Sequence, residues 1–185
     1  MASAVQPRDH DVVTAADDYQ VLSVGARLAA ALLTVESWLR AHKMDDAGIS
    51  AVLEHMWQWL TVTNETFGAW YDFYEVQGPD DLLAAIDEEP LPRRVAFICE
   101  KRGVPAEELA MLLADVVNMV YDELFGAVNL DHSLERLRRV EAVAARSGIS
   151  LPSAERFSVP GLMAQDRHGW GQATVDQVAS WRGRS

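Results

Sequence analysis

The sequence predicts an all-α fold, an irregular bundle of about six helices followed by an extended C-terminal tail. Three observations lead to this prediction. Apolar residues between residues 16 and 149 recur at spacings of three and four, as on one face of a helix. Glycine and proline mark the ends of these segments. No segment alternates apolar and polar residues between hairpin turns, so a sheet is not expected.

The same signals divide the chain of 185 residues into three parts. Residues 1–15 are polar and include Pro7, so we expect a flexible arm there. Residues 16–149 should form a single helical domain, in agreement with a usual domain length of about 100–200 residues. Proline and glycine interrupt residues 150–185, which predicts an extended tail. Val175, Val178 and Trp181 permit one short terminal helix in it.

Three helices are expected in the first half. The first should run from about Asp17 to His42, where two neighbouring apolar stripes give it a wide buried face. A turn at residues 44–48 separates it from a second helix at residues 49–62. A third, shorter helix should end at Gly78, after aromatic residues at helical spacing: Phe67, Trp70, Tyr71 and Tyr74.

The helix ends are better marked in the second half. Pro79 should begin a short helix that ends near Asp87, and Pro92 should begin another. Gly103 can end that helix in the left-handed conformation. The clearest apolar repeat follows Pro105 and continues to Leu124, and a last helix should span residues 131–147. In that last helix we expect an outward-facing arginine series, Arg136, Arg138 and Arg139.

Negative charge is concentrated in the first half of the chain. The net charge is −12, and residues 44–92 contain 11 Asp and Glu but no Lys or Arg. Such a surface repels polyanions, which argues against nucleic-acid binding through this half. It attracts cationic partners, and we therefore expect a basic protein partner.

The sequence also bears on the compartment. The first residues lack the basic and apolar regions of a secretory signal, so we expect a cytoplasmic protein. The most apolar stretch, residues 21–33, contains Arg27 and is shorter than the roughly 20 residues that cross a membrane. Arginine outnumbers lysine 14 to 2 beside abundant Ala and Val, which is typical of a GC-rich bacterial genome.

We predict no catalytic residue, cofactor or metal site. No nucleophile elbow, dinucleotide-binding loop or phosphate-binding loop is present, and Cys99 is expected to be a core thiol. His132 and Glu135 are one helical turn apart, and Asp9, His10 and Asp11 are adjacent, but solvated polar residues explain both patterns. A solvated helix face likewise accounts better than a cation site for four residues of the clearest helix: Asp115, Asn118, Asp122 and Glu123.

The unusual feature is the aromatic segment at residues 57–74, which holds seven of the fifteen aromatic residues. Trp57 and Trp59 are two positions apart, so they point about 200° apart on a helix, and one face cannot bury every ring. Either several helices bury the segment, or some rings reach the surface beside acidic groups and bind Arg and Lys side chains. On the second interpretation the candidate binding residues are Glu54, Trp57, Glu65, Trp70, Asp72, Phe73 and Glu75.

The leading hypothesis is a non-enzymatic, acidic protein-binding module. An immunity protein or antitoxin-like inhibitor is analogous in charge and size, although no motif identifies such a family. The alternative is a small helical enzyme or ligand binder with an aromatic pocket between the helices that carry Trp57, Trp70 and Tyr121. That pocket would turn carboxylates such as Glu54 or Asp115 inward. A third hypothesis is an assembly component with a self-complementary aromatic segment.

Overall fold

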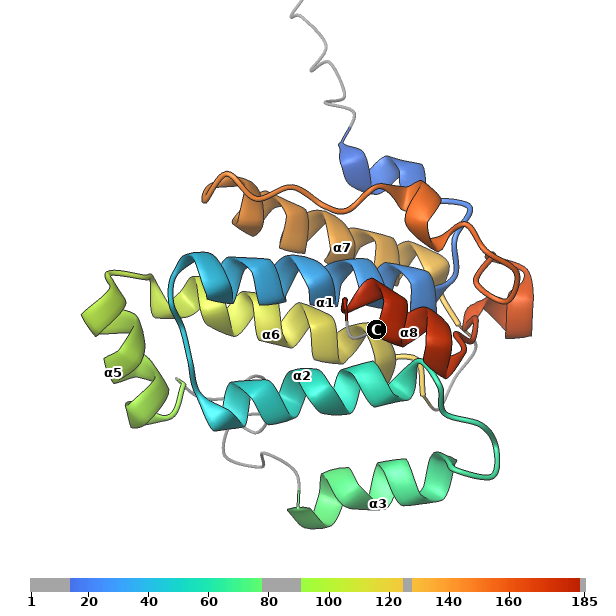
Figure 1. Cartoon of the computed structure of the whole chain (residues 1–185), viewed down its shortest axis with the longest axis horizontal. Coiled ribbons are helices and arrows are strands. Elements are labelled where there is room, and N and C mark those ends of the chain that lie inside the picture. The colour runs from blue at the N-terminus through green and yellow to red at the C-terminus, as the bar shows by residue number, and fades with distance from the viewer. Residues whose placement is uncertain (1–13, 78–90, 125–127, 184–185) are drawn as a thin grey trace, which may run out of the picture.

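The computed structural model describes residues 14–77, 91–124 and 128–183, and within these ranges the all-α prediction is confirmed (Figure 1). The described residues form seven α-helices and three short 3₁₀ turns. Their strand-like pairing is limited to a single bridge between Leu22 and Met163. The short helix expected at residues 79–87 and most of the expected N-terminal arm lie outside the described residues.

The first predicted helix is two elements. A 3₁₀ turn, η1 (Ala15–Tyr19), precedes α1 (Val24–Ala41), and Ser23 begins α1 by accepting a hydrogen bond from the Ala26 amide at 3.3 Å. The chain breaks here because the Ser23 amide donates instead to the Leu162 carbonyl at 2.9 Å. Helix α1 is the centre of the bundle, packed against α2, α6 and α7 (Figure 1).

Helix α2 (Ala47–Trp59) begins at Asp46, whose carboxylate accepts hydrogen bonds from the amides of Gly48 and Ile49. Helix α3 (Phe67–Gln77) follows and packs against α2. Figure 1 shows α3 at the edge of the molecule, with α2 between it and the central helix α1. One flank of α3 is therefore turned away from the bundle.

Three helices form the remainder of the bundle: α5 (Arg93–Arg102), α6 (Ala106–Tyr121) and α7 (Leu130–Ala145). Gly103 ends α5 with a φ of 66°, as its position in the sequence predicted. Helix α6 packs against both α1 and α7. Its apolar face is buried, including Leu109, Leu112, Val116 and Val120.

The C-terminal segment is largely irregular and returns to the bundle. It contains the 3₁₀ turns η2 (Ala154–Phe157) and η3 (Asp166–Gly169) and ends in α8 (Val175–Trp181), the terminal helix that the sequence permitted. The Trp170 carbonyl accepts from the Gly25 amide at 2.8 Å. This close approach requires glycine at position 171, where φ is 66° and a β-carbon would lie 2.1 Å from Ser23 Oγ.

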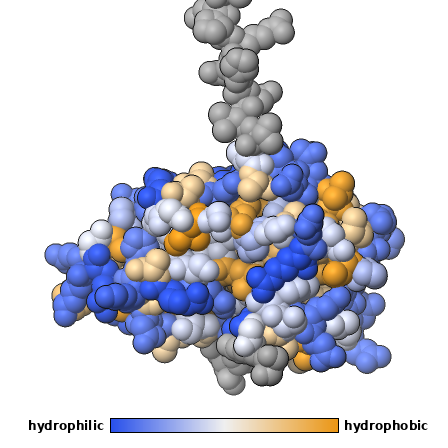
Figure 2. Space-filling view, turned by 45° about the horizontal axis from the view of Figure 1, so that its top comes forward, coloured by the Kyte–Doolittle hydropathy of each residue, from blue (hydrophilic) through white to orange (hydrophobic). Residues whose placement is uncertain are grey.

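The face in Figure 2 is mainly hydrophilic, with apolar residues in separate small patches. The fully buried apolar side chains include Trp38, Trp57 and Phe157, whereas Phe97 and Met111 are exposed. No helix among the described residues is both long and apolar enough to span a membrane.

Candidate functional site

Two of the candidate binding residues are buried. Trp57 is 1% exposed and Trp70 is 5% exposed. The Trp57 indole Nε1 donates to Glu36 at 2.8 Å, and the Trp70 indole Nε1 donates to the His55 carbonyl at 3.0 Å. Burial therefore excludes these two rings from an outward-facing docking surface, because their polar atoms are satisfied inside the protein.

Trp70 is the middle of a stack that joins α3 to the bundle. Its ring lies parallel to the His55 imidazole at 4.4 Å and stacks on Tyr121 at 5.7 Å. His55 Nε2 lies 3.3 Å from the Tyr121 hydroxyl. Burial lowers the pKa of His55 to about 4, so the imidazole is neutral at physiological pH. These rings occupy the region in which the alternative hypothesis expected an aromatic ligand pocket.

Other candidates remain at the surface of α3 and of the turn before it. Glu65 in that turn and Asp72 on α3 are exposed, and Gly68 lies between them in the sequence, with open space around its β-carbon position. Phe67 and Tyr71 are half-buried and stack on each other at 5.8 Å. We call these five residues the α3 face. The side chains of the remaining candidates, Phe73 and Glu75, lie outside the described residues.

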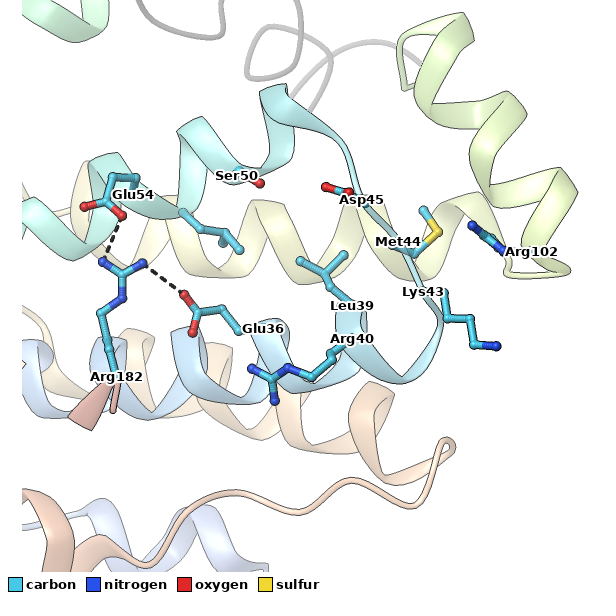
Figure 3. Close-up of a pocket in the computed structure, with 11 residues that line it drawn as sticks. Glu36, Leu39, Arg40, Lys43, Met44, Asp45, Ser50, Glu54, Arg102 and Arg182 are labelled. Atoms are coloured by element: carbon cyan, nitrogen blue, oxygen red, sulfur yellow. Dashed lines mark hydrogen bonds and ion pairs between the residues drawn. The ribbon is translucent and has the colours of Figure 1, made fainter. Parts of the chain in front are cut away.

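Glu54 is part of a different site. It lies on α2, where its carboxylate accepts a hydrogen bond from Arg182 at 2.8 Å. The guanidinium of Arg182 also contacts Glu36 at 3.5 Å and lies over the Trp57 ring at 5.1 Å. Arg182 therefore joins the end of the chain to α1 and α2 (Figure 3).

These ion pairs lie at one end of a groove with a volume of about 710 Å³. The groove lies between α1, the turn after it, α2, and the ends of α5 and α8 (Figure 3). Its apolar lining is formed by the nearly buried side chains of Leu39, Met44 and Leu53. Its other charged lining residues are Arg40, Lys43, Asp45 and Arg102. The groove could not be predicted from the sequence, because the residues that line it lie at positions 36–54, 102 and 182, far apart along the chain.

Replacing Arg182 with methionine is expected to lower the free energy of unfolding by about 2 kcal/mol, since one change removes the ion pairs with Glu36 and Glu54 and the contact with the Trp57 ring. Arg182 is only 9% exposed, whereas Arg146, which pairs with Glu108, is 58% exposed. The matched Arg146→Met change should cost less than about 0.5 kcal/mol. Urea unfolding measures both variants, and equal losses would contradict a special role for Arg182.

Asp115 and Glu123 are buried, so the predicted solvated face is wrong for these two residues, whereas Asp122 is exposed. Asp115 is buried, and its carboxylate accepts hydrogen bonds from Arg136 at 3.2 Å and Arg139 at 2.6 Å. Arg136 also binds Asp122, and Glu123 is buried beside His132. Arg136 and Arg139 of α7 therefore pair with an acidic residue of α6, whereas Arg138 pairs with Asp17 in η1. Arg139 is nevertheless exposed, as the sequence predicted.

The described part of the chain contains possible metal ligands and a single cysteine, Cys99. No three of its His, Cys, Asp and Glu side chains come together in a group that could hold a metal ion. Cys99 is buried, as predicted, and burial raises the pKa of its thiol, which disfavours the reactive thiolate.

Comparisons with known proteins matched no family model, no curated protein and no solved structure.

Proposed function

We propose that the protein is a non-enzymatic binding module that captures a basic protein surface through the α3 face. The observation that carries this proposal is the position of Glu65 in the turn before α3 and of Gly68 and Asp72 on α3, a helix at the edge of the molecule. Both carboxylates are exposed, and Gly68, which lies between them in the sequence, has open space around its β-carbon position. A basic segment can approach the helix backbone there and contact both charges.

No ion pair joins the carboxylates of the α3 face to a described basic residue, whereas several other carboxylates of the bundle are paired. Asp46 on α2 pairs with Arg94, and Asp115 on α6 pairs with two arginines. Arg167 reaches the start of α3, but its guanidinium binds the Val62 carbonyl and the Asn64 side chain. The negative charge of the α3 face is thus available to a partner.

The half-buried rings of Phe67 and Tyr71 complete this face. Their contact with each other and with the bundle fixes their positions, so binding would cost little side-chain entropy. Exposed ring surface beside carboxylates favours arginine and lysine side chains, which can bind the carboxylate and contact the ring together. Such a module suits the inhibition of a cationic protein, in the manner of an immunity protein or antitoxin.

A charge-reversal experiment tests the proposal. The double variant Glu65→Lys/Asp72→Lys should lose a basic protein that the wild type retains from source lysate at low salt. For the purified partner, Kd should rise at least about tenfold, since each reversal removes an attraction and adds a repulsion. Retention by the wild type should weaken at high salt, because screening shortens the range of exposed charges.

The matched control is Glu100→Lys/Glu155→Lys, which makes the same change in net charge at exposed positions on α5 and η2. It should retain the partner, and circular dichroism should show the same helicity for both double variants. Equal loss by the two variants would mean that net charge matters and the α3 face does not. Failure of the wild type to retain a basic protein at low salt would overturn the proposed function.

A further inference from the structure

Arg182 fills a small site whose groups suit an arginine side chain. Its guanidinium binds the Glu54 carboxylate at 2.8 Å, contacts the Glu36 carboxylate at 3.5 Å and lies over the Trp57 ring at 5.1 Å. The Trp57 indole Nε1 donates to the Glu36 carboxylate at 2.8 Å, which holds these two side chains in position. Carboxylates around a planar, charged guanidinium and a ring face beneath it are the groups that bind arginine best. We call Glu36, Glu54 and Trp57 the arginine cage.

The cage and the arginine inside it come from separate parts of the fold. Glu36 lies on α1, and Glu54 and Trp57 lie on α2. These two helices pack against each other, so they hold the cage in place without help from α8. Arg182 directly follows α8, near the end of the described chain, and Figure 3 shows its side chain reaching toward both carboxylates. The cage is therefore a receptor in the bundle, and Arg182 is the ligand that α8 brings to it.

Side chains, rather than the backbone, attach α8 to the bundle. Just before α8 begins, the Ala173 amide donates to the carbonyl at the end of α2 at 2.9 Å. In the described residues that follow, the hydrogen bonds that backbone amides donate stay within the segment. Arg156 donates to the Trp181 carbonyl, and the Trp181 ring packs on that of Phe157 at 5.2 Å. Helix α8 can therefore turn away just after Ala173 without breaking a backbone-to-backbone hydrogen bond to the bundle.

The packing beneath α8 is also incomplete. A cavity of about 220 Å³ lies between α2 and α8, lined on the α8 side by Val175, Val178 and Ala179. Glu54 and Arg182 line this cavity, and they also line the groove of about 710 Å³ beside α1. The Glu54 side chain is 43% exposed, so an incoming arginine can reach it while Arg182 is still bound. A helix of seven residues over unfilled space has little stability of its own.

We propose that the arginine cage binds an arginine side chain of another protein, and that α8 competes with that protein through Arg182. The incoming guanidinium takes over both ion pairs and the ring contact, and α8 turns away from α2. The net charge of −12 favours the approach of a basic partner. Because Arg182 is part of the same chain, its effective concentration at the cage is high, so α8 admits only a segment that binds strongly. This proposal does not rest on the α3 face, which contains none of the cage residues.

NMR titration with the tripeptide glycine-arginine-glycine, blocked at both ends, tests the proposal at constant ionic strength. In the wild type we expect saturable shifts at the cage and at the Trp181 indole, because α8 leaves the bundle. Arg182→Ala removes the competitor, so its Kd for the peptide should be at least about tenfold lower than that of the wild type. Adding Glu54→Gln to this variant should raise Kd at least about fivefold, since it removes one charged partner of the guanidinium.

A second variant and a second peptide make the test specific for arginine. Arg182→Lys keeps the positive charge and perturbs the fold less than Arg182→Ala does. Its Kd should still be about threefold lower than that of the wild type, because an ammonium group cannot match the planar guanidinium in the cage. For the same reason, a tripeptide with lysine in place of arginine should bind Arg182→Ala at least about fivefold more weakly.

The control is Arg146→Ala, which removes an exposed arginine outside the cage that pairs with Glu108. Its Kd for the arginine peptide should equal that of the wild type. Equal Kd values for the wild type and both Arg182 variants would overturn the proposal, and so would wild-type α8 signals that do not move at saturation. Shifts confined to α3 would also overturn it, while the binding proposed for the α3 face would stand.

Discussion

Replacing Arg27 with alanine is expected to destabilise the protein by about 4 kcal/mol, one of the two largest effects that the structure predicts. Arg27 is on α1 and is 1% exposed. Its guanidinium donates to the carbonyls of Tyr19, Gln20 and Leu130 and to the Ser133 hydroxyl. The side chain therefore connects the segment before α1 to the first turn of α7.

The loss of stability in Arg27→Ala has two causes. The shorter side chain leaves a cavity, and the acceptors that Arg27 binds lose their hydrogen bonds. Burial lowers the pKa of Arg27 to about 10, so the guanidinium is still charged at neutral pH and its donors remain bound. Arg27→Met fills most of the space and restores none of these hydrogen bonds. It should recover about 1–2 kcal/mol of the loss.

Chemical denaturation of wild type, Arg27→Ala and Arg27→Met gives the three free energies. Arg93→Ala is the control, since Arg93 is exposed at the start of α5, and it should change stability by less than about 0.5 kcal/mol. If Arg27→Met is as stable as the wild type, the four hydrogen bonds contribute no net stability and the explanation fails.

The second large effect is the loss of stability in mild acid, and it is expected to arise at His55. The folded-state pKa of His55 is about 4 against an ordinary value of 6.5, because the imidazole is buried between α2, α3 and α6. Between these two pH values the unfolded chain binds a proton that the folded chain does not. The contribution of His55 to the free energy of unfolding is therefore fully present above pH 6.5 and is lost as the pH decreases toward 4.

The free energy of unfolding should fall by about 3 kcal/mol as the pH approaches 4. Urea unfolding at several pH values measures it. His55→Phe keeps an aromatic ring to stack on Trp70 and cannot titrate, so its stability should decline much less between pH 6.5 and 4. His168→Gln, at an exposed position, should follow the wild type. Parallel profiles for His55→Phe and wild type would assign the acid sensitivity to other groups.

The helices of this protein could be predicted well because their signals are local. A spacing of three and four residues, Pro92 before α5 and Gly103 after it depend only on neighbouring residues. The break before α1 could not be predicted, because Ser23 and Leu22 pair with residues 162 and 163, far away in the sequence. Apolar residues continue through this break, so periodicity gives no sign of it.

In the aromatic segment at residues 57–74, too, local sequence predicts one part of the structure and distant contacts decide the other. Periodicity indicated that Trp57 and Trp59 point in different directions, but it could not decide which ring would be covered. The tertiary structure buries Trp57 beside Arg182 and covers part of Trp59 with Trp170, and both covering residues come from the C-terminal segment. Of the candidate surface, Glu65 and Asp72 remain exposed, while Trp57 and Trp70 belong to the interior.

The sequence by itself determined the helical class, most helix ends and the negative charge of residues 44–92. Only the tertiary structure decided which acidic groups are paired, which rings are covered, and that residues 40, 43, 102 and 182 line one groove. The reason is physical. Helix periodicity and end signals depend on residues within a few positions, whereas burial and pairing depend on which distant segment packs against each face.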